Sequence, residues 1–137
     1  MKTIITTILI AITLYACDDM KKGYLETQEA GYVTNSMTIY LQPSSTDTVS
    51  YQSEPIQSVI GTFPITYEIA AIRDSTGSIV PVFIASQIRC VRNAVYEISK
   101  NHTIPIGRYT VDLWVININS SILLHEIHTI IVREQDE

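Results

Sequence analysis

One stretch near the end of the chain alternates strictly between two kinds of side chain. It reads GRYTVDLWVIN, from Gly107 to Asn117, and apolar residues recur at every second position from Tyr109 to Val115. A period of two is typical of a β-strand with one buried face. The pattern therefore predicts a strand whose Tyr109 side faces a core, while Asp112 and Trp114 face outward.

Similar short strands are predicted along the chain from Tyr32 onward, because β-branched residues and tyrosines dominate there and no long helical period is present. Turn-forming residues separate these strands, as in RDSTGS at 73–78. The pattern predicts an all-β sandwich of about seven strands in a single domain. Strands are expected at 37–41, 56–60, 65–72, 79–86 (at an edge or bulge, because of Pro81), 94–100, 108–117 and 121–134, with a short edge strand inside the loop 44–55.

Two of these strands resemble a known fold. FPITYEI at 63–69 and PIGRYTVDLWVIN at 105–117 resemble the C-type and F-type strands of bacterial immunoglobulin-like and cadherin-like domains. Gly107, Arg108 and Tyr109 resemble the tyrosine corner of that fold, in which the hydroxyl bonds nearby backbone at the start of strand F. The resemblance implies an immunoglobulin-like β-sandwich, but it carries little information about function.

The first sixteen residues have the composition of a secretory signal peptide. Lys2 is followed by an uncharged stretch from Thr3 to Ala16 that is rich in Ile and Leu, and a basic start with an apolar region is typical of such signals. The stretch is shorter than the ~20 residues with which a helix crosses the hydrocarbon core. A short membrane anchor or a buried helix is the alternative.

The end of this segment, Leu14-Tyr15-Ala16-Cys17, resembles the lipobox of bacterial lipoproteins. The resemblance implies that residues 1–16 are removed and that Cys17 is lipidated, although Tyr15 departs mildly from the usual box. An incidental cysteine beside an ordinary cleavage site is the alternative. The polar segment 17–31 is then expected to be a lipidated tether, 32–137 the immunoglobulin-like domain, and the membrane a partner through the N-terminal lipid.

The net charge limits the class of partner. It is −5 for the whole chain, and removal of Lys2 with the signal makes it one unit more negative. Nucleic acids and anionic membranes attract basic clusters, and Lys21-Lys22 in the tether is the one basic pair of lysines. We therefore expect no nucleic-acid partner.

Cys90 has no cysteine partner if Cys17 carries lipid. It is predicted to be a small apolar residue in a strand. A reactive thiol, with its pKa lowered by Arg89 and Arg92, is the alternative.

A lipobox followed by one such domain is also similar to small surface lipoproteins of Bacteroidota, many of which are encoded with glycan-uptake systems. GYLETQEAGYV at 23–33 and IQSVIGTFPITYEI at 56–69 carry this resemblance. It implies an outer-membrane location, periplasmic or surface-exposed, and an accessory role in binding a polysaccharide or an envelope protein. A structural or assembly role in the envelope, through β-edge protein contacts, is the alternative.

Trp114, the single tryptophan of the chain, is the leading candidate for a ligand surface. An outward tryptophan beside Asp112 suits a sugar, because the ring can stack on it while the acid accepts hydrogen bonds. It also suits a protein contact, where tryptophan is enriched. Tyr40 could share this surface, although the sequence does not give the strand order. The alternative is that Trp114 only covers the sheet.

No recognisable catalytic or metal-binding motif is present. His125 and His128 in HEIH are three residues apart, so on a strand they point to opposite faces unless a bulge intervenes. A G-x-S-x-G motif is absent, and carboxylates are spread over several predicted strands. We therefore expect a non-enzymatic protein with no catalytic residue, no metal and no cofactor.

Two triplets are similar to the O-glycosylation signal of Bacteroidota, which is Asp, then Ser or Thr, then a small or apolar residue. They are Asp47-Thr48-Val49 and Asp74-Ser75-Thr76, and both lie in predicted loops. The similarity implies Thr48 and Ser75 as possible modification sites.

Overall fold

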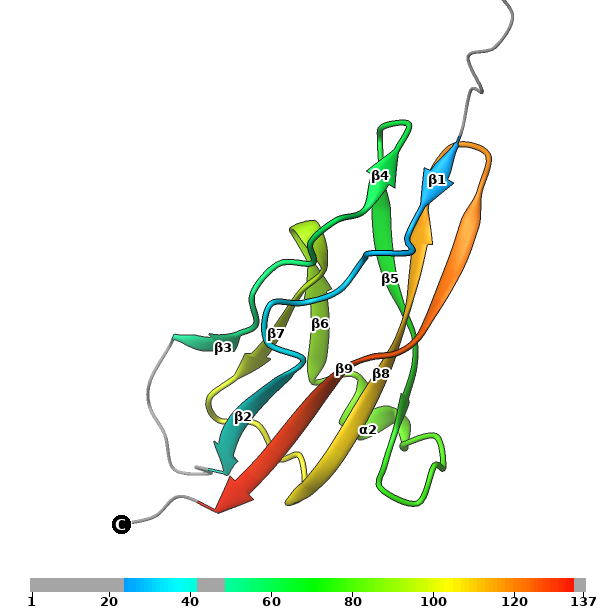
Figure 1. Ribbon diagram of the computed structural model, residues 1–137. Coiled ribbons are helices and arrows are strands. Elements are labelled where there is room, and N and C mark those ends of the chain that lie inside the picture. Colours follow the sequence, from blue (N-terminus) through cyan, green and yellow to red (C-terminus); the bar gives the residue numbers. More distant parts are fainter. Residues whose placement is uncertain (1–23, 42–48, 135–137) are drawn as a thin grey trace, which may run out of the picture.

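The computed structural model describes residues 24–41 and 49–134. This part of the chain forms nine strands, one short α-helix and one 3-10 helix (Figure 1). The helices are α2 (Val82–Ala85) and η1 (Arg92–Ala94). The strands are β1 (Leu25–Glu26), β2 (Ser36–Leu41), β3 (Ser50–Gln52), β4 (Ile60–Gly61), β5 (Thr66–Arg73), β6 (Ile88–Val91), β7 (Val95–Ser99), β8 (Gly107–Ile116) and β9 (Ser121–Glu134).

Seven of these strands form two sheets that pack as a sandwich (Figure 1). One sheet has the order β2-β9-β8-β5 and the other has the order β3-β7-β6. β2 runs parallel to β9, and the other pairs within the two sheets are antiparallel. With β5, β8 and β9 as strands C, F and G, and β3, β7 and β6 as B, E and D, the orders C-F-G and B-E-D match those of an immunoglobulin-like sandwich. The first strand differs from the constant type, because β2 joins the C-F-G sheet and not the B-E-D sheet. The predicted all-β sandwich is therefore confirmed.

The core lies between the two sheets. The larger sheet contributes Ile39, Val111, Leu113 and Ile130, and the smaller sheet contributes Tyr96 and Ile98; none of these side chains has exposed surface. Along β8 the alternate residues from Tyr109 to Val115 are buried. The inward face predicted from the period of two is therefore confirmed.

The tyrosine corner expected at Tyr109 is present. Its hydroxyl donates a hydrogen bond to the carbonyl oxygen of Pro105 at 2.8 Å. The bond links the first residues of β8 to the loop that precedes them, which fixes the direction in which the strand enters the sheet.

Two β-bulges flank the middle of β8. Val111 pairs with His128 and Leu113 with Leu124, so three residues of β9 lie opposite Asp112 alone. On the other side, β5 has a bulge between Ile69 and Ala71. Both neighbours of β8 are therefore irregular at the same point. Bulges of this kind increase the twist of a strand and change the direction of its side chains.

The strand predicted at 79–86, with its edge or bulge at Pro81, is wrong. Pro81 is instead the N-cap of α2, and only Ile84 of the helix is buried. A proline at the start of a helix loses no hydrogen bond, because the first amides of a helix have no partner within it. The next strand is β6, which contains Cys90 as predicted.

Residues of the expected tether take part in the fold. Leu25 and Glu26 form β1, which pairs with β4. A side chain at Gly61 would place its Cβ 2.6 Å from the Tyr24 carbonyl oxygen, so only glycine allows this close approach. The β1–β4 pair lies beside the turn of the β8–β9 hairpin (Figure 1), where Asn117 Nδ2 donates to the same Tyr24 oxygen at 3.0 Å.

Within the described residues, no helix has the length and apolar character needed to cross a membrane.

Candidate functional site

Trp114 lies on the outer face of the larger sheet, as its place in the alternation predicts. Its side chain is 36% exposed, although its neighbours Leu113 and Val115 are buried in the core. In the register of the sheet it lies between Glu68 of β5 and Leu123 of β9. All three side chains are exposed, so an aromatic ring, a carboxylate and an aliphatic side chain form one row across the sheet.

Asp112 does not face solvent, contrary to the prediction. It is only 3% exposed, and residues of the β9 bulge and Arg73 of β5 contact its carboxylate. Its Oδ1 atom accepts a hydrogen bond from the Glu126 backbone N–H at 2.8 Å and lies 3.0 Å from His125 Nδ1. Its Oδ2 atom accepts one from Arg73 Nε at 3.3 Å. These contacts give Asp112 a structural role in the sheet.

The same contacts keep the Asp112 carboxylate in its ionised form. Burial alone would raise the pKa of Asp112, but the Glu126 amide, His125 and Arg73 together hold this pKa below its ordinary value. Asp112 is therefore ionised at neutral pH, and its charge is matched by Arg73. Glu68, beside Trp114, makes no ion pair with any residue that the structure describes.

Tyr40 is exposed on the same face but at the opposite end of the sheet. It pairs with Arg133 of β9, whereas Trp114 pairs with Leu123. These two partners are ten residues apart along β9, which corresponds to roughly 30 Å at the rise of a strand. Trp114 and Tyr40 therefore cannot contact the same one or two sugar units.

The three histidines lie apart from one another. His125 is on the outer face beside Asp112, while His128 is in the core between Tyr32 and Tyr96, with ring centroids 4.7 and 5.2 Å away. His102 is buried, with its Nε2 atom 3.0 Å from the Tyr40 carbonyl oxygen. A bulge does intervene between His125 and His128, but their side chains still lie on different sides of the sheet. The described residues hold no cluster of three or more potential metal ligands.

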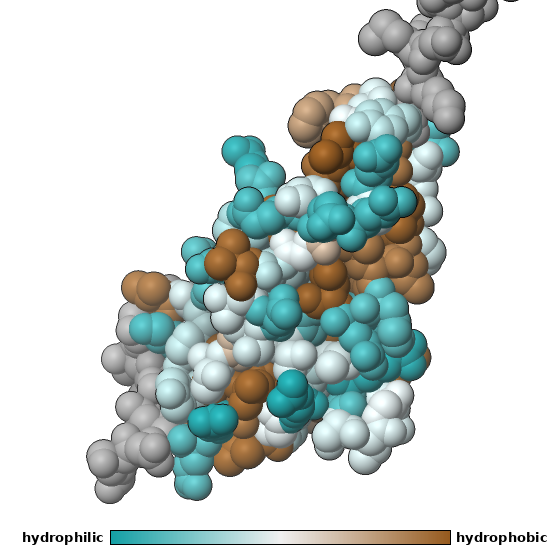
Figure 2. Space-filling view, in the orientation of Figure 1, coloured by the Kyte–Doolittle hydropathy of each residue, from teal (hydrophilic) through white to brown (hydrophobic). Residues whose placement is uncertain are grey.

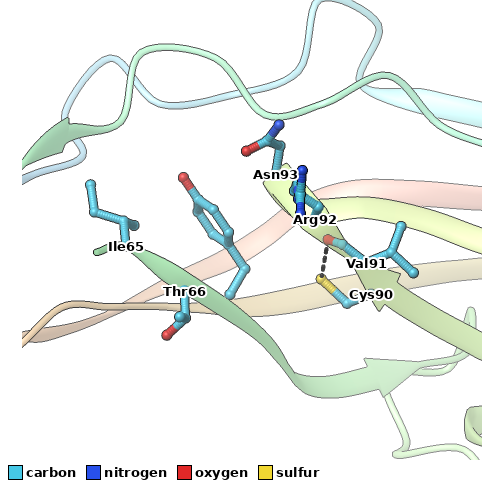
Figure 3. A pocket seen from close by; sticks show the side chains of 7 residues that line it. Ile65, Thr66, Cys90, Val91, Arg92 and Asn93 are labelled. Carbon is cyan, nitrogen blue, oxygen red and sulfur yellow. Dashed lines mark hydrogen bonds between the residues drawn. The ribbon is translucent and has the colours of Figure 1, made fainter. Parts of the chain in front are cut away.

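A cleft lies between β5 of the larger sheet and β6 of the smaller sheet. Figure 3 shows this cleft of about 350 Å³, which is lined by Ile65 and Thr66 on the β5 side and by Cys90, Val91 and Asn93 on the β6 side. Burial raises the pKa of the Cys90 thiol to about 11, so the thiol is protonated at neutral pH. The reactive alternative for Cys90, in which its arginine neighbours lower the pKa, does not hold.

The remaining predicted sites lie in turns or outside the described residues. Ser75 is exposed in the turn after β5, where the Asp74 carboxylate accepts hydrogen bonds from the backbone N–H groups of Thr76 and Ser78. Thr48 and Cys17 are not among the described residues, and their modification stays a prediction.

Sequence reasoning missed Glu68 as the neighbour of Trp114. The alternation along β8 predicts an outward Trp114, but only the strand order brings Glu68 of β5 next to it. No spacing within either strand carries this information, because the two residues are distant in the chain.

No protein-family model matches the chain, and no curated protein sequence matches it. Among solved structures, the chain is similar to BT4661, a SusE-like surface-located polysaccharide-binding protein from the heparin utilisation locus of Bacteroides thetaiotaomicron. The TM-score is 0.54 and the sequence identity is 17%, over 82% of this chain and 15% of that one. The similarity shows a shared fold, and this chain spans only a small part of that longer protein.

Proposed function

We propose that this protein is a non-enzymatic, lipid-anchored protein of the bacterial cell surface that binds a polysaccharide through the outer face of the sheet around Trp114. The row formed by Glu68, Trp114 and Leu123 carries the proposal, because it places an exposed ring next to a free carboxylate. Carbohydrate rings have apolar faces that stack on tryptophan and hydroxyl groups that donate hydrogen bonds to carboxylates.

The electrostatics around Trp114 favour an uncharged polysaccharide. Arg73 and His125 both contact the Asp112 carboxylate, whose negative charge weakens the attraction of this site for a sulfate or carboxylate group of a sugar. Glu68 and Glu126, which are exposed on the same part of the sheet, repel such groups. The proposed ligand is therefore a neutral glycan, which would differ from the heparin named for the locus of BT4661.

The lipid anchor rests on the lipobox resemblance at Leu14 to Cys17. The similarity in fold to part of a surface-located protein supports the same compartment. Labelling with palmitate, followed by membrane fractionation of wild type and Cys17→Ala, tests the anchor. Label on the wild type alone is expected, and equal membrane retention of both proteins without label would remove the anchor.

Affinity gel electrophoresis tests the binding surface. The native gels contain laminarin, galactomannan, xylan or heparin, and they compare the wild type with Trp114→Ala and Phe83→Ala. Phe83 is an exposed aromatic residue of α2, on the far side of β5 from Trp114, so it serves as the matched control. We expect at least one neutral polymer to retard the wild type and the Phe83 variant but not the Trp114 variant. Equal retardation of all three proteins would exclude Trp114.

A second candidate function is assembly through β-edge contacts at β5. This strand has one neighbour in its sheet. Ile79 bridges Arg73 at the C-terminal end of its outer edge, and an apolar groove of about 340 Å³ lies beside that edge. An extended segment of another protein could add to that edge and place apolar side chains in the groove. Ala70→Pro tests this function, because proline removes a backbone donor in the bulge of β5. Loss of cross-linked envelope partners in the variant, with its retardation by glycan unchanged, would favour this second function.

A further inference from the structure

One end of the molecule presents several large apolar side chains to solvent. We call this end the apolar tip; it consists of Tyr24, β1, β4, the segment from β4 to β5 and the turn of the β8–β9 hairpin. Phe63 is 81% exposed and Ile118 is 73% exposed. Figure 2 shows brown surface over the tip half of the β8–β9 hairpin and beside β1. The exposed apolar residues of the tip are Tyr24, Ile60, Phe63 and Ile118.

The tip is held together by backbone contacts, so its side chains form one surface. The Tyr24 carbonyl oxygen accepts hydrogen bonds from the Thr62 N–H at 2.9 Å and from Asn117 Nδ2 at 3.0 Å. These bonds join β1 to the segment that carries Phe63 and to the turn that carries Ile118. The three segments therefore present their apolar side chains from one framework.

Two of the segments that form the tip carry no charged side chain. Residues 58–66 (SVIGTFPIT) and 114–124 (WVININSSILL) contain no ionisable side chain, although 17% of the whole chain is charged. Both stretches converge on the tip, and the nearest acid on β1 is Glu26, opposite Ile60. An uncharged apolar surface of this kind marks a contact with a protein or a membrane.

The path of the chain distinguishes between these two partners. Six residues lie between Cys17 and Tyr24, so even a fully extended connection of seven Cα–Cα steps spans at most about 25 Å. Tyr24 is itself part of the tip. The opposite end of β5 lies roughly 23 Å further away, because the eight residues of this strand make seven steps at the strand rise. An anchor at Cys17 thus keeps the tip, and not the opposite end, close to the bilayer.

We infer that the apolar tip rests on the lipid surface in which Cys17 is anchored, with Phe63 and Ile118 inserted at the interface. The inference rests on the lipid anchor of the proposed function. Aromatic and aliphatic side chains are stabilised by burial at the headgroup level and need no basic patch for this. Such a contact is therefore compatible with the negative net charge of this chain. The strands then stand steeply on the membrane, and the face that carries Trp114 stays open at the side.

Fluorescence quenching by brominated lipids tests the inference. The full chain, purified from membranes, is reconstituted in phosphatidylcholine vesicles with or without dibrominated phosphatidylcholine. Two variants are compared in a Trp114→Phe background, so that each has a single tryptophan: Phe63→Trp at the tip and Ile79→Trp as the matched control. Ile79 is 67% exposed and lies in the turn at the opposite end of β5.

We expect the Phe63→Trp protein to lose about half of its emission in brominated vesicles and the Ile79→Trp protein to lose little, since an interfacial tryptophan lies at the headgroup level. Equal quenching of both, or quenching of neither, would overturn the inference when the intact mass shows lipid on Cys17. An intact mass without lipid would instead overturn the anchor itself. Quenching of neither variant together with a dimer in cross-linking would assign the tip to a protein contact.

Discussion

The backbone N–H of Glu126 donates a hydrogen bond to the Asp112 carboxylate at 2.8 Å, across the bulge of β9. This contact explains why Asp112 is buried while Trp114, two residues along the same strand, is exposed. The three residues of β9 opposite Asp112 leave a backbone amide turned toward β8, and the carboxylate satisfies it. The outer face thus has a structural acid at its centre and a free acid, Glu68, beside the tryptophan.

Replacement of Asp112 tests its structural role. Asp112→Ala should lower the free energy of unfolding by about 2 kcal/mol, because a buried amide and a partly buried guanidinium lose their acceptor. Asp112→Asn should cost about half as much, since it keeps an acceptor for Glu126. Urea denaturation at neutral pH measures both.

The control for this prediction is the surface pair of Arg89 and Glu97, 3.6 Å apart. Arg89→Ala should change the free energy of unfolding by about 0.5 kcal/mol or less, because exposed ion pairs contribute little. Similar losses for Arg89→Ala and Asp112→Ala would show that Asp112 does not organise the bulge.

His128 should make the protein sensitive to acid. It is 2% exposed, neither ring nitrogen has a hydrogen-bond partner among the described residues, and burial lowers its pKa from 6.5 to about 4. The unfolded chain therefore takes up a proton at His128 before the folded chain does. Stability conferred by the neutral ring is complete above pH 6.5 and falls by about 3 kcal/mol as the pH drops from 6.5 to 4.

His128→Phe isolates this effect, because phenylalanine retains the contact with Tyr32 and Tyr96 and does not titrate. Urea denaturation at pH 7, 5 and 4 should show a smaller loss of stability on acidification for the variant than for the wild type. Parallel losses in the two proteins would mean that His128 is not buried in its neutral form.

The tyrosine corner should contribute measurably to stability. Tyr109→Phe removes the hydroxyl that donates to Pro105, and the expected loss is about 1 kcal/mol. Tyr40→Phe is the matched control, because the Tyr40 ring is exposed. An unchanged denaturation midpoint in Tyr109→Phe would contradict the role of this bond.

Cys90 should be unreactive in the folded protein. Its raised pKa leaves almost no thiolate at neutral pH, so iodoacetamide should label it slowly before unfolding and rapidly in urea. The measurement uses a Cys17→Ala variant, in which Cys90 is the only thiol. Fast labelling at pH 7 without urea would show that the cleft between β5 and β6 is more open than the structure indicates.

The sequence predicted those features that depend on local pattern. The period of two gave β8 and its buried face, and Gly107 to Tyr109 gave the tyrosine corner, because both are properties of single strands. Helix α2 was missed because the short run after Pro81 is rich in Val, Ile and Phe, which also suit a strand. A helix of one turn has too few residues to show its own period.

Which residues lie beside Trp114 depends on pairing between strands that are distant in the sequence. The pattern within a single strand gives no information about such pairing. Asp112 is contacted by residues of the β9 bulge, and no glycine in the sequence of that bulge signals it. Glu68 adjoins Trp114 only because β5 is next to β8. Tyr40 shares the outer face, as the alternation suggested, but the register of β9 sets it far from Trp114.

The most direct test of the proposed binding surface uses the intrinsic fluorescence of Trp114, the single tryptophan in the chain. The wild-type protein is titrated with oligosaccharides from the neutral polymer that retards it in gels, and with heparin oligosaccharides at low salt. Stacking of a sugar on the ring should produce a saturable change in emission with the neutral ligand and none with heparin. A saturable change with heparin alone, or retention of the neutral polymer with no change in Trp114 emission, would contradict the account.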